Sequence, residues 1–194
     1  MSLSLKNISK RFDSKIIFKN FSYTFSETGV YAIVGESGTG KTTLLRIICG
    51  LDTKAEGEII GGGIINTSFA FQEYRLFPHL SAVQNIVAAN GESDDAELTE
   101  NARKLLMRLG FTDSELNLLP SELSGGMKQR VSLVRAFLRK TPILLLDEPT
   151  KELDEKIRET LYDMINEEGK KRLVIIVSHH MEDFEKLDAV KIYI

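Results

Sequence analysis

Hydrophobic residues along the chain follow two periods, one typical of strands and one typical of helices. In the first 28 residues they recur at every second or third position, as in LSLKNISKRF and IIFKNFSYTF. This spacing predicts antiparallel strands joined by a turn near Asp13 and Ser14. The run GVYAIVG that follows is apolar and bounded by glycines, which is typical of a strand buried on both faces.

Further along, residues 42–49 have a helical spacing that stops at Gly50, and residues 57–72 predict short strands around a triple-glycine turn. Helix-forming residues with polar breaks then continue to about Lys140. Two apolar runs, PILLLD and RLVIIVSH, flank the amphipathic pattern LDEKIRETLYDMINEEG. Strand, helix and strand with such apolar strands predict a parallel sheet with right-handed crossovers.

Composition and charge narrow the class of protein. The 194 residues are 42% hydrophobic and 27% charged, which is average for a soluble globular chain and excludes disorder or a fibrous repeat. The net charge of −3 gives no basic field that would attract nucleic acid. The one cysteine, Cys49, lies in an apolar run and predicts a buried thiol. No apolar run approaches the roughly 20 residues that a bilayer requires, so we expect a soluble, cytoplasmic protein.

The stretch GESGTGKT lies between the strand VYAIV and the helix TTLLRIIC, which is the context of a phosphate-binding loop. Its glycines allow successive backbone N–H groups to surround phosphate oxygens, and the helix adds a partial positive charge. We expect Lys41 to reach the outer phosphates and Thr42 to ligate Mg²⁺. The alternative is a flexible turn between a strand and a helix. The loop makes the predicted fold an α/β P-loop NTPase.

Polar residues follow the ends of three predicted strands. Asp147 and Glu148 end ILLLDE, His179 ends the next apolar strand, and Gln72 closes SFAF. In an open α/β sheet, ligands bind at this carboxyl edge. Asp147 would hold Mg²⁺, Glu148 would orient or deprotonate the attacking water, and His179 would donate a hydrogen bond to the terminal phosphate. Each taken singly is more often a turn residue.

A second glycine-rich stretch, LSGGMKQR, lies within the predicted helical insert. Ser124 supplies a hydroxyl, and Gly125 and Gly126 allow a phosphate close to the backbone. The helix predicted from Met127 to about Arg139 contributes its positive end. An ordinary helix cap with adjacent glycines is the alternative.

The order of these motifs, over almost the whole chain, resembles that of ATP-binding-cassette (ABC) ATPases. By that resemblance Gln72 corresponds to the Q-loop glutamine, Asp147 and Glu148 to the Walker B aspartate and catalytic glutamate, and His179 to the switch histidine. Leu153 and Asp154 in KELD correspond to the D-loop. The residues that correspond to the Walker A loop are Gly35, Glu36, Ser37, Gly38, Thr39, Gly40, Lys41, Thr42 and Thr43. Those of the signature run from Leu123 to Met127 and include Ser124, Gly125 and Gly126.

The resemblance implies ATP and Mg²⁺ as cofactors. Thr42, Gln72 and Asp147 would hold the metal ion, while Lys41, Gln72, Glu148 and His179 would be catalytic. Phe12 matches the aromatic residue on which adenine stacks. The resemblance also implies a head-to-tail dimer with a second ABC subunit, homo- or heteromeric. In that dimer each signature faces the γ-phosphate bound by the other subunit.

The sequence predicts one ABC domain over residues 1–194, with a catalytic core at 1–73 and 141–194 and a helical subdomain at 74–140. Four features depart from the family pattern. KELD lacks the small residues usual before Leu-Asp, Phe12 replaces the commoner tyrosine, and His180 stands where an aspartate often follows the switch histidine. The segment from Gly57 to Gln72 is also shorter than usual.

The favoured hypothesis is a transporter motor docked on separate transmembrane permease subunits, on the inner face of the cell membrane. The stretch FQEYRLFPHLSAVQNI resembles the segment of importer ATPases that receives the permease, and Tyr74, Leu76 and Phe77 would form that patch. Import is favoured, and a substrate-binding protein is a candidate further partner. The alternatives are a non-transport ABC ATPase, disfavoured because the chain has no long coiled coil and no basic tract, and a regulatory subunit with little hydrolysis.

Overall fold

The structure is a computed structural model that describes residues 2–13, 15–90, 95–179 and 183–194. It divides into two compact units, each with its own internal packing. The sheet unit comprises Met1–Phe69, Thr141–Asp147 and Ile165–Ile194. The helical unit comprises Ala70–Lys140 and Glu148–Met164. Among the described residues, no helix is both long enough and apolar enough to cross a bilayer.

A small antiparallel sheet opens the sheet unit, as the alternating pattern predicts. Its strands, in the order β2-β1-β4, are β2 (Lys15–Thr24), β1 (Ser4–Phe12) and β4 (Glu56–Ile60). Asp13 follows β1 with a φ of 48°, in the left-handed region that Asp tolerates better than most residues. The predicted turn is therefore confirmed at Asp13, while Ser14 lies outside the described residues.

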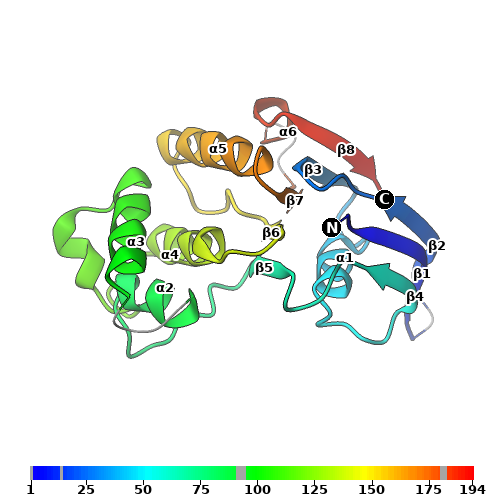
Figure 1. Cartoon of the computed structure of the whole chain (residues 1–194), viewed down its shortest axis with the longest axis horizontal. Helices are drawn as coiled ribbons and strands as arrows, with labels where there is room; N and C mark the ends of the chain where they lie inside the picture. The colour runs from blue at the N-terminus through cyan, green and yellow to red at the C-terminus, as the bar shows by residue number, and fades with distance from the viewer. Residues whose placement is uncertain (1, 14, 91–94, 180–182) are drawn as a thin grey trace. The chain divides into compact units, whose positions relative to one another are not determined.

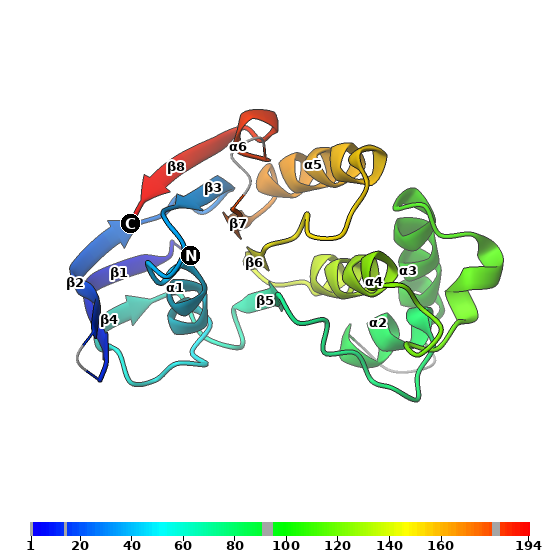
Figure 2. The same ribbon diagram turned by 180° about the vertical axis from the view of Figure 1, so that it is seen from behind.

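The larger sheet has the order β5-β6-β7-β3-β8, and Figure 2 shows these strands side by side. Their bounds are β5 (Thr67–Ala70), β6 (Ile143–Asp147), β7 (Leu173–Val177), β3 (Gly29–Val34) and β8 (Ala189–Tyr193). Pairing of β6 with β7, β7 with β3 and β3 with β8 is parallel. Every residue of β6 and β7 is buried, which confirms the strands inferred from the apolar runs.

The hydrophobic pattern did not single out β8. This strand lies at one edge of the sheet, and Val190 and Tyr193 in it are exposed while Ile192 is buried. An edge strand with one buried residue in five has no continuous apolar run, so the hydrophobic pattern does not reveal it. Its pairing with β3 identifies it as a strand.

The helix α1 (Lys41–Ile48) packs into the core of the sheet unit (Figure 1). Its apolar face consists of Leu44, Leu45, Ile47 and Ile48, all fully buried. Cys49 follows the helix and is also buried, as predicted. Burial raises the pKa of its thiol, so the side chain behaves as a small apolar group.

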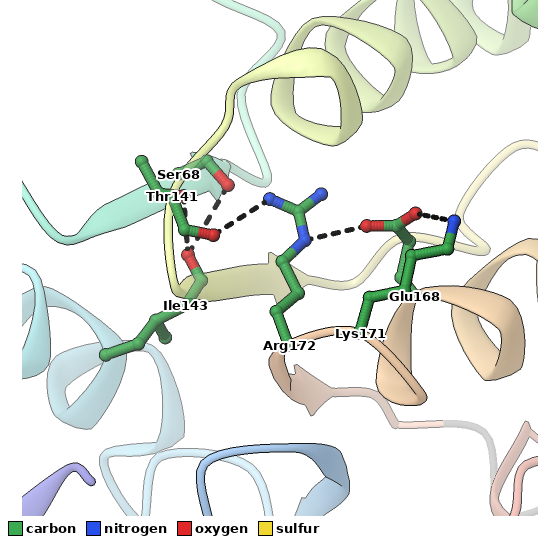
Figure 3. Close-up of polar contacts among 6 residues, drawn as sticks. All are labelled: Ser68, Thr141, Ile143, Glu168, Lys171 and Arg172. Carbon is green, nitrogen blue, oxygen red and sulfur yellow. Dashed lines mark hydrogen bonds and ion pairs between the residues drawn. The ribbon is translucent and has the colours of Figure 1, made fainter. Parts of the chain in front are cut away.

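A buried arginine ties together the amino ends of β6 and β7, as Figure 3 shows. The Nε of Arg172 donates to Glu168 Oε2 at 2.8 Å, and its Nη1 donates to the carbonyl of Thr141 at 3.4 Å. The Thr141 hydroxyl in turn donates to the carbonyl of Ile143 at 3.0 Å. This network lies at the edge opposite the carboxyl ends of the strands, so it supports the fold and leaves that edge for ligands.

The helical unit is built on three helices that pack pairwise, α2 with α3 and both with α4, as Figure 1 shows. They are α2 (Ala82–Asn90), α3 (Ala96–Arg108) and α4 (Gly125–Leu138), with a short 3-10 helix, Asp113–Asn117, between the last two. The helix α5 (Glu155–Gly169) begins in this unit and ends in the sheet unit, which also contains α6 (Asp183–Lys186). The side chain of Ile157 in α5 lies beside Gly110, where a Cβ would be 2.8 Å from its Cδ1.

Candidate functional site

The loop that follows β3 requires glycine at two positions. Gly40 has a φ of 103°, and a Cβ there would lie 2.2 Å from Cγ2 of Ile17. Gly38 has a φ of 80°. Any other side chain at these two positions would be strained or would clash. Glycine therefore allows the chain to curl tightly from β3 into α1. Backbone N–H groups at such a turn before a helix are suited to bind phosphate.

The ammonium group of Lys41 lies inside this loop. Its Nζ donates to the carbonyls of Gly35 at 2.9 Å and Glu36 at 2.8 Å, and only 4% of the residue is exposed. The Thr39 hydroxyl also donates to the carbonyl of Glu36, at 3.0 Å. A fixed positive charge is therefore placed where the predicted phosphates would bind.

Thr42 and Asp147, the two predicted Mg²⁺ ligands of the sheet unit, are hydrogen-bonded. The Thr42 hydroxyl donates to Oδ1 of Asp147 at 3.0 Å. Burial raises the pKa of Asp147, and the bond from Thr42 and the nearby Arg46, His179 and Lys41 oppose that rise. A hydroxyl and a carboxylate, both oxygen donors next to a phosphate loop, fit the few protein ligands that Mg²⁺ takes beside phosphates and water.

His179 and Phe12 are both exposed. His179 lies two residues beyond β7 and interacts electrostatically with Asp147, so both residues lie at the carboxyl edge of the large sheet. His180, which departs from the family pattern, lies outside the described residues. Phe12 ends β1 with half of its surface exposed, and the Lys10 ammonium lies 4.8 Å from its ring centroid. An exposed ring is available for stacking.

The helical unit holds Glu148, which is buried and has a φ of 53°. A residue with a side chain adopts this left-handed conformation only where its surroundings enforce it, and such residues concentrate at functional sites. Here the side chain of Gln129 on α4 donates to the carbonyls of Glu148 and Pro149, both at 3.2 Å. Nothing in the sequence pattern pointed to Gln129.

The signature helix begins two residues earlier than predicted. α4 starts at Gly125, and the Ser124 hydroxyl accepts a hydrogen bond from the N–H of Met127 at 3.2 Å. Serine is a favoured N-cap because it satisfies one of the free N–H groups of the first turn. Ser124 therefore acts as the helix cap that was the alternative to a phosphate cradle. Gly125 and Gly126 lie in the first turn of α4.

The D-loop residues lie directly before α5. Oδ1 of Asp154 accepts from the N–H of Ile157 at 3.0 Å, so Asp154 caps that helix. Glu152, two residues earlier, has a φ of 61°. Leu153 is half-buried, and its N–H donates to the carbonyl of Thr150 at 3.2 Å.

Gln72 is exposed, two residues beyond β5, and the segment after it is fixed by residues that the sequence did not flag. Arg135 on α4 donates to the carbonyls of Tyr74 and Arg75, both at 2.8 Å. The fully buried Asn85 accepts from the N–H of Phe77 at 2.7 Å and donates to the carbonyls of Phe77 and Leu80. The buried Asn85 and the half-buried Arg135 thus give the loop before α2 a fixed shape.

The predicted site residues are therefore divided between the units. In the sheet unit the phosphate loop, Thr42, Asp147 and His179 lie at one edge of the large sheet, with Phe12 on the small sheet. In the helical unit the signature residues and the turn after Glu148 pack on one helix, α4. Among the described residues, no group of three or more His, Cys, Asp or Glu side chains could hold a metal ion by itself, so phosphate oxygens or water would have to complete an Mg²⁺ site.

Known proteins with this organisation were found by sequence. The model of the ABC transporter family matches residues 18–151. The thiamine import ATP-binding protein ThiQ of Histophilus somni is 38% identical over 92% of this chain and 90% of its own length. The sulfate/thiosulfate import ATP-binding protein CysA of Acinetobacter baylyi is 40% identical over 83% of this chain and 50% of its own length. The spermidine/putrescine import ATP-binding protein PotA of Thermotoga maritima is 37% identical over 82% and 46%. The chain thus spans about half the length of the last two.

Solved structures with the same fold were also found. The ATP-binding cassette MJ0796, in a dimeric post-hydrolysis state bound to ADP and Pi, has a TM-score of 0.81 and 29% identity over 99% of this chain and 94% of that chain. A second dimeric structure of MJ0796, described as a bacterial ABC transporter cassette, has a TM-score of 0.80 and covers 98% of this chain.

Proposed function

The chain belongs to the ABC transporter family, and we propose that it is the ATP-hydrolysing subunit of an importer that acts through separate membrane-spanning permease subunits. The observation that carries the proposal is the phosphate loop with its partner aspartate. Lys41 lies inside the loop, and Thr42 donates to Asp147 at the adjacent strand end. Together they provide a cradle for phosphate and oxygen ligands for a metal ion.

We assign the nucleotide contacts of the sheet unit as follows. The loop binds the phosphates, its Lys41 neutralises the outer phosphate oxygens, and the exposed ring of Phe12 stacks on adenine. Thr42 and Asp147 would hold Mg²⁺. When bound, this ion would draw charge from the phosphate oxygens.

Glu148 is the residue we assign to the attacking water. A carboxylate next to Asp147 in sequence, in a backbone conformation enforced by Gln129, is suited to orient a water and accept its proton. His179 would donate a hydrogen bond to the charge that develops on the phosphate. Ser124, Gly125 and Gly126 would serve the nucleotide of a second subunit in a head-to-tail dimer.

The contact with the permease is assigned to the segment that holds Tyr74, Leu76 and Phe77. Phe77 is 48% exposed, although the loop around it is fixed by Asn85 and Arg135. An apolar side chain kept exposed by a rigid loop is available to a partner at little entropic cost. We expect this contact to hold the subunit on the cytoplasmic face of the membrane.

We expect the whole transporter complex, and not the cassette alone, to determine which solute is transported. The similar proteins are named for the import of an anion, a polyamine and a vitamin, so similarity to them assigns no single solute to this chain. A non-transport role predicts that no membrane protein binds the chain. Isolation of the subunit with its native membranes, followed by identification of the proteins bound to it, distinguishes an importer subunit from a non-transport ABC ATPase.

The test of the activity compares two variants with a control. Lys41→Ala should lose ATP binding, because the Lys41 ammonium, held by the carbonyls of Gly35 and Glu36, is the buried positive charge placed inside the loop. Glu148→Gln should retain ATP binding, lose hydrolysis by about a hundredfold or more and accumulate a nucleotide-bound dimer. Lys170→Ala, a change of one exposed lysine, should match the parent. Unaltered turnover in Glu148→Gln would contradict the role of Glu148, and normal binding in Lys41→Ala would contradict the assigned loop.

A further inference from the structure

Glu152 places its carboxylate against the first turn of the signature helix. A Cβ built on Gly125 would lie 1.8 Å from Oε2 of Glu152 and 3.0 Å from its Cδ. A Cβ on Gly126 would lie 2.5 Å from the carbonyl oxygen of Glu152. The side chain and backbone of one residue therefore occupy the space that the two glycines leave open. In the sequence, this is the position of KELD where a small residue is usual.

Tyr74 fixes the carboxylate in this place. Its hydroxyl donates to Oε2 of Glu152 at 2.7 Å. The main chain of Tyr74 is held in turn by Arg135. The contact thus joins the segment that we assign to the permease with the turn before α5.

The electrostatic consequence concerns the positive end of α4. Its free N–H groups favour one anion nearby, and the Glu152 carboxylate already provides it. A phosphate brought against Gly125 would meet this like charge at short range and be repelled. The Glu152 side chain is exposed, so it can turn into solvent once the Tyr74 bond is broken.

We propose that Glu152, held by Tyr74, is an inhibitory latch on the signature helix, which opens when the permease moves the Tyr74 segment. The inference rests on the proposed function, because it takes the signature glycines to face the nucleotide of a second subunit. In the subunit alone, the latch would oppose ATP-driven dimerisation. Glu152, one of the residues by which KELD departs from the family pattern, would thereby limit hydrolysis when no permease is bound.

The test measures dimerisation by the purified subunit without permease. All variants carry Glu148→Gln, which slows hydrolysis, and light scattering after size exclusion gives the ATP concentration at half-maximal dimer. Glu152→Gln and Glu152→Ala should each lower this concentration about two- to fivefold, the typical effect of one charge at a helix end. Tyr74→Phe should shift it in the same direction by a smaller factor. Glu155→Gln removes the same charge from an exposed site nearby and should match the parent.

The possible outcomes distinguish a failure of the latch from a failure of the proposed function. Equal ATP requirements in the parent and Glu152→Gln would overturn the latch. An effect of Glu152→Ala without one of Glu152→Gln would show a steric block and would also overturn it. If a fluorescent ATP analogue binds but no variant dimerises, the head-to-tail site fails and the latch with it. If no variant binds the analogue, the proposed function itself fails. Melting temperatures close to the parent's show that each variant is folded.

Discussion

Alanine substitutions at the two signature glycines should have different effects on stability, because different parts of Glu152 face them. At Gly125 the new Cβ would meet the end of an exposed side chain. At Gly126 it would meet a backbone carbonyl oxygen at 2.5 Å. A side chain can rotate away, whereas the carbonyl belongs to a turn in which Leu153 donates to Thr150 and Gln129 holds the preceding residues.

The magnitudes follow from these contacts. Gly125→Ala displaces the Glu152 carboxylate and breaks its bond with Tyr74, a loss of about 1 kcal/mol. The higher helix propensity of alanine returns up to about 1 kcal/mol, so the net change is close to zero. Gly126→Ala requires a backbone shift of nearly 1 Å, and overpacking of this kind costs about 1 to 3 kcal/mol. After the propensity gain, we expect a net loss of about 1 to 2 kcal/mol.

Thermal unfolding followed by circular dichroism measures the difference. For a chain of this size each kcal/mol moves Tm by about 2 to 4 °C, so Gly126→Ala should lower Tm by about 2 to 8 °C and Gly125→Ala by less than about 2 °C. In a Glu152→Ala background, Gly125→Ala should raise Tm, because only the propensity gain remains. A fall in Tm for Gly125→Ala as large as that for Gly126→Ala would refute the assignment of the two contacts.

The same variants separate the two uses of Gly125. If the glycine serves only to accommodate Glu152, then Gly125→Ala combined with Glu152→Ala should hydrolyse ATP at the rate of Glu152→Ala alone. If the glycine also faces the nucleotide of a second subunit, that double variant should be stable and yet inactive. We expect the second result, with ATP affinity of the monomer nearly unchanged.

Two further predictions concern the sheet unit. Burial alone would raise the pKa of Asp52, but its hydrogen bond and ion pair with Lys10 and its contacts with Lys54 hold it below the ordinary value. The ionised form is therefore favoured on folding, so the Tm advantage over Asp52→Asn should be full above about pH 5 and shrink as pH falls through the lowered pKa; an advantage that grows with acid would contradict this. Arg172→Met leaves the buried side of Glu168 without its guanidinium and should cost about 3 kcal/mol, or about 6 to 12 °C in Tm. A Tm within 2 °C of the parent's would show that the network in Figure 3 contributes little.

Sequence reasoning succeeded where a local pattern determines the geometry. The apolar runs around ILLLD and LVIIV predicted β6 and β7, because only strands covered on both faces are apolar at every position. The predicted phosphate loop lies between β3 and α1 as its motif requires. Its hydrogen bond from Thr42 to Asp147 joins residues that are adjacent only in the folded sheet. The sequence had assigned both to Mg²⁺, Thr42 from the phosphate-loop motif and Asp147 from its place at a strand end.

The residues that sequence reasoning missed act through contacts distant in sequence. Arg135 holds the carbonyls of Tyr74 and Arg75, 60 or more positions away, and any exposed helix has arginines of the same appearance. Asn85 resembles an ordinary polar residue in VQNI, although it is fully buried and organises the loop before it. The start of α4 was misplaced because two glycines are poor helix formers, and the Ser124 cap and the packed turn above them outweigh that propensity.

The helical unit links the residue assigned to hydrolysis with the residues assigned to the second subunit's nucleotide. Gln129 of α4 holds the carbonyl of Glu148, while Gly126 of the same helix packs under the carbonyl of Glu152. The turn from Glu148 to Glu152 therefore rests on α4 at both ends, and two of its residues have positive φ values that only such support maintains. Arg135 attaches the Tyr74 segment to the other end of α4. A force applied to that segment would consequently reach Glu148 through one helix. The Glu152 contact would be the first to break, because it depends on a single hydrogen bond that Tyr74 donates to an exposed carboxylate.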